Sequence, residues 1–322
     1  MANKKPDANS EKFKSKIGGQ ALIEGVMMRG IEKSAMALRL PTGEIEVETW
    51  NNKNGKNPPW YMKTPFIRGP FNFVISLKDG YKCLSKSADR AMDFEEEEPQ
   101  TKFEKWLDDH IGDKLMPIVT TLGVILGVAL AVVLFMWLPS VCSKLLGKVI
   151  PLNSVGKTVI EGIIKIILFV GYMALTALMK DIRRTYEYHG AEHKTIACYE
   201  AQEELTVENV KKQCRFHPRC GTSFIIITLI VSIVITSVLR LPWDNIILRM
   251  IIKLLLIPVY VSISYEFIRL AGRYSNPFTR ALSAPGLWLQ RITTREPDDS
   301  EIEVAIESLK PCIPENAEDD EW

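Results

Sequence analysis

Histidine and cysteine are scarce in this 322-residue sequence, and their scarcity limits what the protein can be. There are four histidines and six cysteines. The cysteines are irregularly spaced in a chain of this size, so we expect no disulfide framework. The net charge is only +1, and no broad positive field therefore favours nucleic acid as a partner. No apolar run follows the basic N-terminus, so we also expect no signal peptide.

Long apolar runs are abundant by contrast, and they are concentrated in one part of the chain. A helix of about 20 apolar residues crosses the hydrocarbon core of a bilayer. Glu161 and Lys165 in the second run are expected to neutralise each other or to reach the interface. One such helix would fit the core of a soluble protein, but four close together indicate membrane spans. The predicted spans are Ile118–Leu138, Thr158–Met179, Ser223–Leu241 and Ile246–Ile268.

Basic residues near the span ends predict the orientation of the chain. Fourteen lysines and arginines lie near the ends on one side, and five lie near the ends on the other. Because short loops rich in Lys and Arg stay in the cytoplasm, both termini and residues 180–222 are expected to be cytosolic. Membrane lipids are therefore the expected surroundings of the spans.

The polar parts of the chain are expected to fold around this bundle. Residues 1–16 are interpreted as a disordered basic arm and residues 93–100 as an acidic linker. A Pro-Gly turn between alternating segments predicts a β-hairpin over Ser34–Trp50. Helical spacing of apolar residues predicts an amphipathic helix over Phe66–Met92, packed against a partner or lying at the bilayer surface. A short helix is expected over Ser300–Lys310.

The expected fold class is therefore mainly α. A four-span transmembrane helix bundle occupies residues 101–270, with a cytosolic α+β region at residues 17–100 and a cytosolic C-terminal region at residues 271–322. The polar segment 180–222 between the second and third spans is expected to carry the functional site.

The scarce residues gather in this segment. Tyr186–Phe224 contains three of the four histidines and three of the six cysteines. On a helix, His189, Glu192 and His193 share one face, and two histidines four residues apart suit one Zn²⁺. Their order, H-x-x-E-H, is that of inverzincin metallopeptidases, with Glu192 as a partner of the ligands or a general base. The alternative is a pair of surface histidines, and Gly190 would weaken the helix by about 1 kcal/mol.

A second group follows in the pattern C-x2-H-x2-C. Cys214, His217 and Cys220 place three nitrogen or sulfur ligands close together, and His189 or His193 would supply a fourth. Alternatively, Cys220 is a small buried residue and His217 packs against a span. The two readings are balanced for the cysteines, and a functional role is favoured for His217.

Two further candidates lie far from this segment. Gly18 and Gly19 indicate a turn or a close backbone approach, and Glu24 follows them. Glu24 is a general base, a metal ligand or the ion-pair partner of Arg29, and the ion pair is slightly favoured. Glu266, near the end of the fourth span, would complete a metal triad with the histidines, although a pair with Arg269 is favoured.

Arg219 stands beside the start of the third span. A guanidinium next to free N–H groups at a helix start makes an anion site for a lipid phosphate or a substrate carboxylate. Capping of the helix by Thr222 or Ser223 would explain the same residues without a ligand.

Five segments together resemble a known family. They are GGQALIEGVMMRG, YHGAEHKTIACYE, HPRCGTSF, SYEFIRLAG and PGLWLQRITTREP. They are similar to segments of the YqhQ-like bacterial multi-pass membrane proteins, and the similarity extends from about Gly18 to Leu309. Resemblance to bacterial multi-pass membrane proteins implies the inner membrane as the location. The family is also labelled as predicted metal-dependent enzymes. This label implies a metal role for His189, Glu192, His193, His217 and Cys220, with Glu24 as a further candidate. Cys214 lies outside the shared segments.

The leading hypothesis is a zinc-dependent hydrolase or peptidase at the cytosolic membrane face, with a protein or peptide substrate. His189 and His193 bind zinc, completed by His217, Cys220 or Glu266. Glu192, with Glu24 as a second candidate carboxylate, activates water, and Arg29 and Arg219 hold an anionic substrate group. The rival is a non-enzymatic scaffold or regulator with a structural zinc site. Transport is disfavoured because ionisable residues occur only near the span ends.

Overall fold

The computed structural model describes residues 13–53, 55–92, 118–274 and 276–320. The chain forms two compact units from interleaved segments. The first consists of Met1–Ala91, Met173–Thr228 and Val261–Trp322, and the second of Met92–Tyr172 and Leu229–Tyr260. Most of the predicted basic arm and the whole acidic linker lie outside the described residues. The end of the arm is held, because Ser15 Oγ donates to Asp320 Oδ2 at 2.6 Å.

An antiparallel sheet of four strands forms the centre of the first unit, with the strands in sequence order. β3 and β4 are the predicted hairpin, and Gly43 in its turn has a φ of +89°. The sequence did not indicate β1 and β2, because β2 is buried at almost every position and shows no alternation. The strands are β1 (Gly18–Leu22), β2 (Gly25–Arg29), β3 (Lys33–Arg39) and β4 (Ile45–Asn51).

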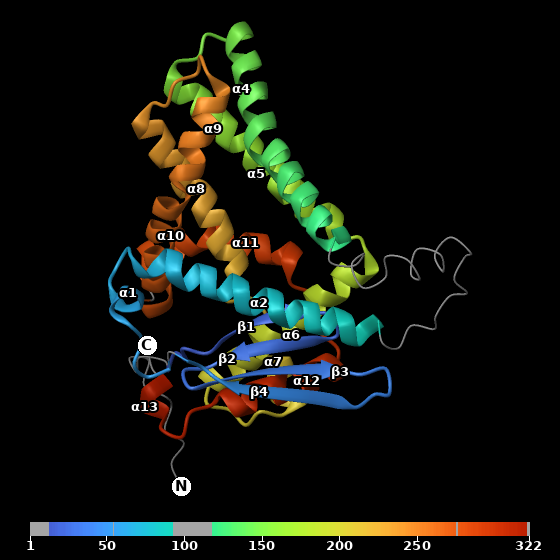
Figure 1. The fold of residues 1–322 in the computed structure, drawn as a ribbon. Helices are drawn as coiled ribbons and strands as arrows, with labels where there is room; N and C mark the ends of the chain where they lie inside the picture. Colours follow the sequence, from blue (N-terminus) through green and yellow to red (C-terminus); the bar gives the residue numbers. More distant parts are fainter. Residues whose placement is uncertain (1–12, 54, 93–117, 275, 321–322) are drawn as a thin grey trace, which may run out of the picture. The chain divides into compact units, whose positions relative to one another are not determined.

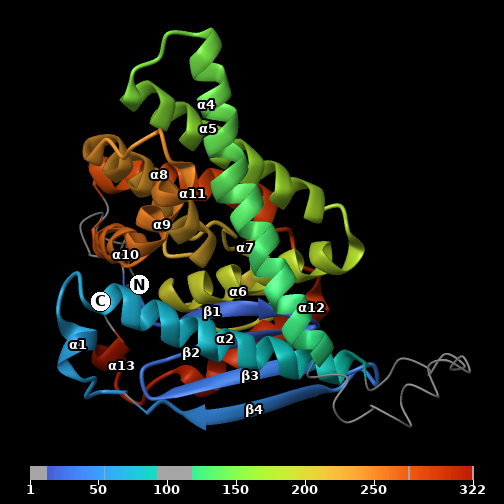
Figure 2. The same ribbon diagram turned by 45° about the horizontal axis from the view of Figure 1, so that its top comes forward.

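Helices cover both faces of this sheet (Figures 1 and 2). α6 (Lys180–Glu200) and α12 (Asp299–Leu309) pack on one face, where they meet alternate residues of β3 such as Ala35 and Ala37. α2 (Arg68–Met92) covers the other face, where Cys83 packs with Met36 and Leu38. Because successive side chains of β3 point to opposite faces of the sheet, β3 contributes to two separate cores.

The predicted amphipathic helix and the predicted C-terminal helix are both confirmed as α2 and α12. α2 packs on the sheet through Gly80, where an added Cβ would lie 2.2 Å from Gln20 Oε1. Its outer side leaves Val74, Leu77 and Tyr81 exposed. The remaining elements of the first unit are α1 (Trp60–Lys63), α7 (Val207–Lys212), α11 (Pro277–Thr293), η2 (Lys310–Cys312) and α13 (Ala317–Asp320).

The second unit is helical. It contains η1 (Val133–Trp137), α4 (Leu138–Val149), α5 (Ser154–Thr176) and α9 (Ile246–Leu255), while α8 (Gly221–Leu239) and α10 (Ile257–Arg273) run through both units. Three helices are long and apolar enough to cross a membrane: Ile118–Val149, Ser154–Thr176 and Gly221–Leu239. α9 and α10 make a fourth candidate span if the pair counts as one.

Two of the predicted spans differ from the structure in shape. The first helix continues to Val149, so much of the connection expected after Leu138 is helical. The fourth is bent by 46° between α9 and α10. Pro258 lies at this bend and has no N–H to continue the helical hydrogen bonds.

Candidate metal centre

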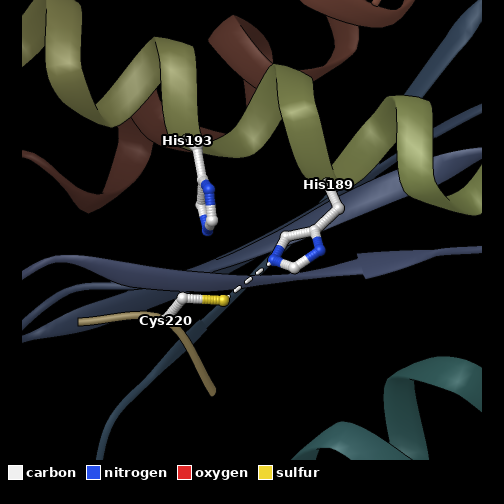
Figure 3. Close-up of side chains that lie close together, drawn as sticks. All are labelled: His189, His193 and Cys220. Carbon is white, nitrogen blue, oxygen red and sulfur yellow. Dashed lines mark hydrogen bonds between the residues drawn. The ribbon is translucent and has the colours of Figure 1, made fainter. Parts of the chain in front are cut away.

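Three scarce side chains converge in the first unit. His189 and His193 lie four residues apart on α6, and Cys220 immediately precedes α8. One ligand atom from each lies within 4.8 Å of the other two. Figure 3 shows both imidazoles pointing from α6 toward the Cys220 sulfur. α6 continues unbroken through Gly190, so the predicted shared helix face is present.

Backbone carbonyls fix the hydrogen positions on both imidazoles. His189 Nδ1 lies 2.8 Å from the Thr293 carbonyl oxygen, and His193 Nδ1 lies 2.6 Å from that of Arg215. A carbonyl oxygen only accepts, so each Nδ1 must carry the hydrogen. In the neutral imidazoles this leaves Nε2 with a free lone pair. Metal-binding histidines are held in this way by a hydrogen bond from the other ring nitrogen.

The sulfur of Cys220 lies close to the imidazole of His189. Its distance from His189 Nε2 is 3.1 Å. Burial alone would raise the pKa of the Cys220 thiol, but the nearby imidazoles of His189 and His193 hold this pKa well below its usual range. Burial likewise opposes the charged form of His189, but the Cys220 thiolate raises the pKa of His189 to about 9. The thiolate is the species that binds metal, so the donor set fits a zinc ion.

Glu192 lies beside this group. Burial raises the pKa of the Glu192 carboxyl, which interacts electrostatically with His189, His193 and Cys220. The backbone of Gly19 gives it a hydrogen bond. A Cβ at Gly19 would lie 3.0 Å from the Glu192 Cδ and 2.7 Å from the Met27 carbonyl oxygen. The predicted close backbone approach is therefore confirmed at Gly19, where β1 contacts α6.

Gly190 has a packing role that the sequence did not reveal. A Cβ at this position would lie 1.9 Å from the Arg295 carbonyl oxygen. The Arg295 N–H donates to the Tyr186 carbonyl oxygen at 2.8 Å. The segment that follows α11 can therefore run directly along α6, which brings the Thr293 carbonyl to His189.

Gln290 of α11 holds the loop that carries Cys220, and it is fully buried. Its Oε1 accepts from the His217 N–H at 2.8 Å, and its Nε2 donates to the His217 carbonyl oxygen at 2.7 Å. Nε2 also donates to Ser223 Oγ at 2.9 Å. Gly286 on the same helix leaves room for Ser223, since a Cβ there would lie 2.3 Å from its Oγ. Gln290 and Thr293 were not predicted from the sequence, although both lie in the shared segment PGLWLQRITTREP.

His217 lies next to the three residues without joining them. Its ring centroid is 5.6 Å from that of His193. Burial lowers the pKa of His217, so the ring is neutral near pH 7. Arg219 donates to His217 Nε2 at 3.2 Å, forms an ion pair with Glu200 and donates to the Ser15 carbonyl oxygen at 2.7 Å. The guanidinium expected to bind an anion is therefore engaged with Glu200.

The expected pair between Glu24 and Arg29 is wrong. Glu24 lies in the turn between β1 and β2 and accepts from Arg184 and, at 3.3 Å, from Tyr188 Oη. Arg29 lies at the far end of β2 and pairs with Asp79 at 3.2 Å. The two side chains are separated by the length of a strand. Glu24 has a φ of +51°, a conformation that costs free energy in a residue other than glycine.

Glu266 and Cys214 also lie outside the group of three. Glu266 accepts from Arg68 at 2.8 Å and from the Phe66 N–H at 3.1 Å. Arg68, which begins α2, is thus the hydrogen-bonded partner of Glu266, and the expected partner Arg269 interacts with it electrostatically. Cys214 is exposed, and among the described residues it does not share a ligand group with Cys220. The pattern C-x2-H-x2-C therefore does not act as one set.

Comparison with known proteins places the chain in a family. The model of the family described as "Protein of unknown function (DUF1385)" matches residues 64–315. The chain is 36% identical over 298 residues to "Uncharacterized protein YqhQ" of Bacillus subtilis (strain 168), a match that covers 92% of each chain. No solved structure matches the chain. The predicted resemblance is confirmed, and the protein belongs to the YqhQ-like family of bacterial proteins.

Proposed function

We propose that the protein is a zinc-dependent hydrolase of the bacterial inner membrane, with His189, His193 and Cys220 as the zinc ligands. The observation that carries the proposal is the set of three ligand atoms within 4.8 Å of one another. Catalytic zinc sites have three protein ligands and one open position, whereas structural sites have four. A thiolate and two imidazoles held through Nδ1 suit this arrangement.

The residues around the ligands would divide the remaining work. A bound Zn²⁺ supplies a Lewis acid and lowers the pKa of an adjacent water toward neutrality. Glu192 is buried beside the ligands, and burial raises the pKa of its carboxyl. A carboxylate with a raised pKa is a suitable general base near neutral pH. Glu192 would accept the proton of the attacking water and return it to the leaving group.

The location of the site follows from the predicted spans. The apolar helices and the distribution of basic residues support a multi-pass protein with both termini in the cytosol. The ligand-bearing segment would then lie at the cytosolic membrane face. A peptide, a protein segment or an ester that reaches this face is the expected substrate.

Replacement of Glu192 tests the proposed chemistry. Glu192 lies outside the group of three, so Glu192→Gln is expected to retain zinc while hydrolysis falls by about 100-fold or more, as for loss of a general base. Zinc content and hydrolysis of a panel of peptides and esters in nanodiscs are the measurements. Glu187→Gln on the same helix, where Glu187 pairs with Arg183, is the matched control. Full hydrolysis in Glu192→Gln would overturn the assignment of the base.

A structural zinc site is the second candidate, and one observation favours it. The neutral ring of His217 lies 5.6 Å from His193, near enough to become a fourth ligand after a small movement. Zinc with four protein ligands would hold the loop before α8 against α6. In that case His189→Ala would unfold the first unit, and Glu192→Gln would have no effect beyond stability.

A further inference from the structure

A second group of ionisable side chains lies in the helices of the second unit. α5 contributes Glu161 and Lys165, and α9 contributes Arg249 and Lys253, each pair four residues apart. Glu161 is 2% exposed, Arg249 0% and Lys253 4%. Glu161, Arg249 and Lys253 are therefore removed from water, and Lys165 is half-buried. α5, and α9 taken together with α10, are apolar enough to cross a membrane.

The single carboxylate of this group is fully engaged. Glu161 accepts from Ser140 Oγ at 2.7 Å and from Arg249 at 2.8 Å, and it also accepts from Lys253. Glu161 therefore forms its ion pairs with α9, and its interaction with Lys165 of the same helix is electrostatic only. Arg249 and Lys253 of α9 donate to the Glu161 carboxylate, which was expected to neutralise Lys165 of α5.

Lys165 is consequently left without a counter-ion. It interacts electrostatically with Glu161 and Arg249, but among the described residues its ammonium has no hydrogen bond or ion pair. It lies about 16 Å along α5 from Ser154, in the middle of a helix long enough to cross a membrane rather than near a span end as expected. With one carboxylate and three basic side chains, the group has two positive charges in excess. Uncompensated charge at such a depth is strongly unfavourable.

Buried donors without partners lie at the same place. Arg249 Nε and Tyr260 Oη are buried and have no hydrogen-bond partner among the described residues. Tyr260 is 5% exposed and interacts electrostatically with Glu161 and Arg249. The Arg249 guanidinium is fixed further by the Trp243 ring, whose centroid lies 3.8 Å from it. A buried donor without an acceptor is costly, and an oxyanion would satisfy the donors and the excess charge together.

We propose that Lys165, Arg249, Lys253 and Tyr260 form a binding site for a phosphate group. A phosphate monoester or inorganic phosphate carries up to about two negative charges near neutral pH, which equals the excess of this group. The ammonium groups of Lys165 and Lys253 neutralise it, and Arg249 Nε and Tyr260 Oη donate to its oxygens. The source is either a lipid with a terminal phosphate or free phosphate. This site is independent of the zinc proposal.

The test uses the full chain in phosphatidylcholine nanodiscs. Either phosphatidic acid in the bilayer or inorganic phosphate in the buffer is expected to raise the midpoint of thermal unfolding. Lys165→Met is expected to weaken the apparent affinity about tenfold or more, the effect of one charge-assisted contact. Because Lys165 has no protein partner, the variant should fold, and Lys165→Arg should keep the effect. The exposed Lys148 of α4 provides the matched control, Lys148→Met.

Each outcome decides between the possibilities. A response to phosphatidic acid alone assigns the site to a lipid headgroup, and a response to inorganic phosphate assigns it to the free anion. The proposal is overturned if neither anion changes the midpoint, or if Lys165→Met responds as strongly as the wild type. An equal loss in Lys148→Met would also overturn it, because the effect would then reflect net charge alone.

Discussion

At the scale of single residues, main-chain atoms orient the candidate ligands. The carbonyls of Thr293 and Arg215 hold the two imidazoles through their Nδ1 atoms, and no side-chain substitution removes these acceptors. The orientation of His189 and His193 therefore depends on the path of the backbone around α6. Substitutions that move this path should affect metal binding even where they touch no ligand.

Glu301 allows a residue-scale prediction about pH. Burial raises the pKa of its carboxyl to about 7, and Oε1 has no hydrogen-bond partner among the described residues. A raised folded-state pKa contributes stability that is complete below the unfolded pKa of about 4.3 and is lost as pH rises through about 7. The wild type should therefore lose up to about 3 kcal/mol of unfolding free energy between pH 4.5 and pH 8 from this group.

Chemical unfolding at several pH values measures this loss. Glu301→Gln cannot ionise, so the part of the pH dependence due to Glu301 should be absent from this variant. Glu303→Gln on the same helix is the control, because Glu303 is largely exposed and pairs with Arg39. Identical pH dependence in Glu301→Gln and the wild type would contradict the prediction.

The residue types in the sequence predicted the candidate metal ligands, but they did not predict the residues that hold these ligands in place. The spacing of His189, Glu192 and His193 and the presence of Cys220 were readable, because helical periodicity and ligand chemistry are local properties. Gln290 and Thr293 could not be predicted, since they act through contacts with residues 67 to 104 positions away. The ion pair of Glu266 with Arg68, 198 positions away, was missed for the same reason.

At the scale of elements, the contact between α6 and the segment after α11 permits a second prediction. Gly190→Ala would place a Cβ 1.9 Å from the Arg295 carbonyl oxygen. The gain in helix propensity of about 1 kcal/mol should be outweighed by this overlap, so we expect net destabilisation of about 1–3 kcal/mol. Zinc affinity should fall as well, because the Thr293 carbonyl moves with the segment.

Thermal unfolding and zinc titration check the prediction for Gly190. Gly171→Ala in α5 is the matched control, because a Cβ there has no atom within 4 Å. The control should retain its zinc affinity, and its unfolding midpoint should stay the same or rise with the gain in helix propensity. A Gly190→Ala variant that binds zinc as tightly as the wild type would show that the segment does not position His189.

The elements differ in how far the sequence specified them. Apolar length alone predicted the long helices, and the Pro-Gly turn predicted the β3–β4 hairpin, whose observed bounds are Lys33–Arg39 and Ile45–Asn51. β2 escaped detection because its burial at almost every position removes the alternation of a half-buried strand, and β1 begins with the Gly18-Gly19 pair, which indicated a turn or a close backbone approach. The partners of Glu161 in α5 were not predicted, since Arg249 and Lys253 come from α9, 88 and 92 positions away.

At the scale of the whole molecule, the orientation in the membrane is the prediction to test. The segment between α4 and α5 is expected outside the cytosol, and the segment before α8 inside it. A membrane-impermeant maleimide should therefore label Pro151→Cys in intact cells, in a background with Cys142 and Cys214 replaced by serine. In a second protein that keeps Cys214, this exposed cysteine should be labelled only after permeabilisation. The reverse pattern would place the candidate metal centre on the other side.

The division into two units could not have been read from the sequence. The first unit gathers Met1–Ala91, Met173–Thr228 and Val261–Trp322, so the chain passes through it three times. The predicted division by sequence order separated residues 17–100, 180–222 and 271–322. The five shared segments lie in this one unit, and four of them supply Gly19, the two histidines, Cys220 and Gln290.

Zinc content and zinc X-ray absorption of the purified full chain test the central claim most directly. We predict one zinc per chain, lost in Cys220→Ser and retained in Cys214→Ser. The first coordination shell should contain one sulfur at about 2.3 Å and three nitrogen or oxygen atoms at about 2.0–2.1 Å, one of them from an exchangeable water. A wild type without zinc, or zinc that survives in Cys220→Ser, would contradict the account.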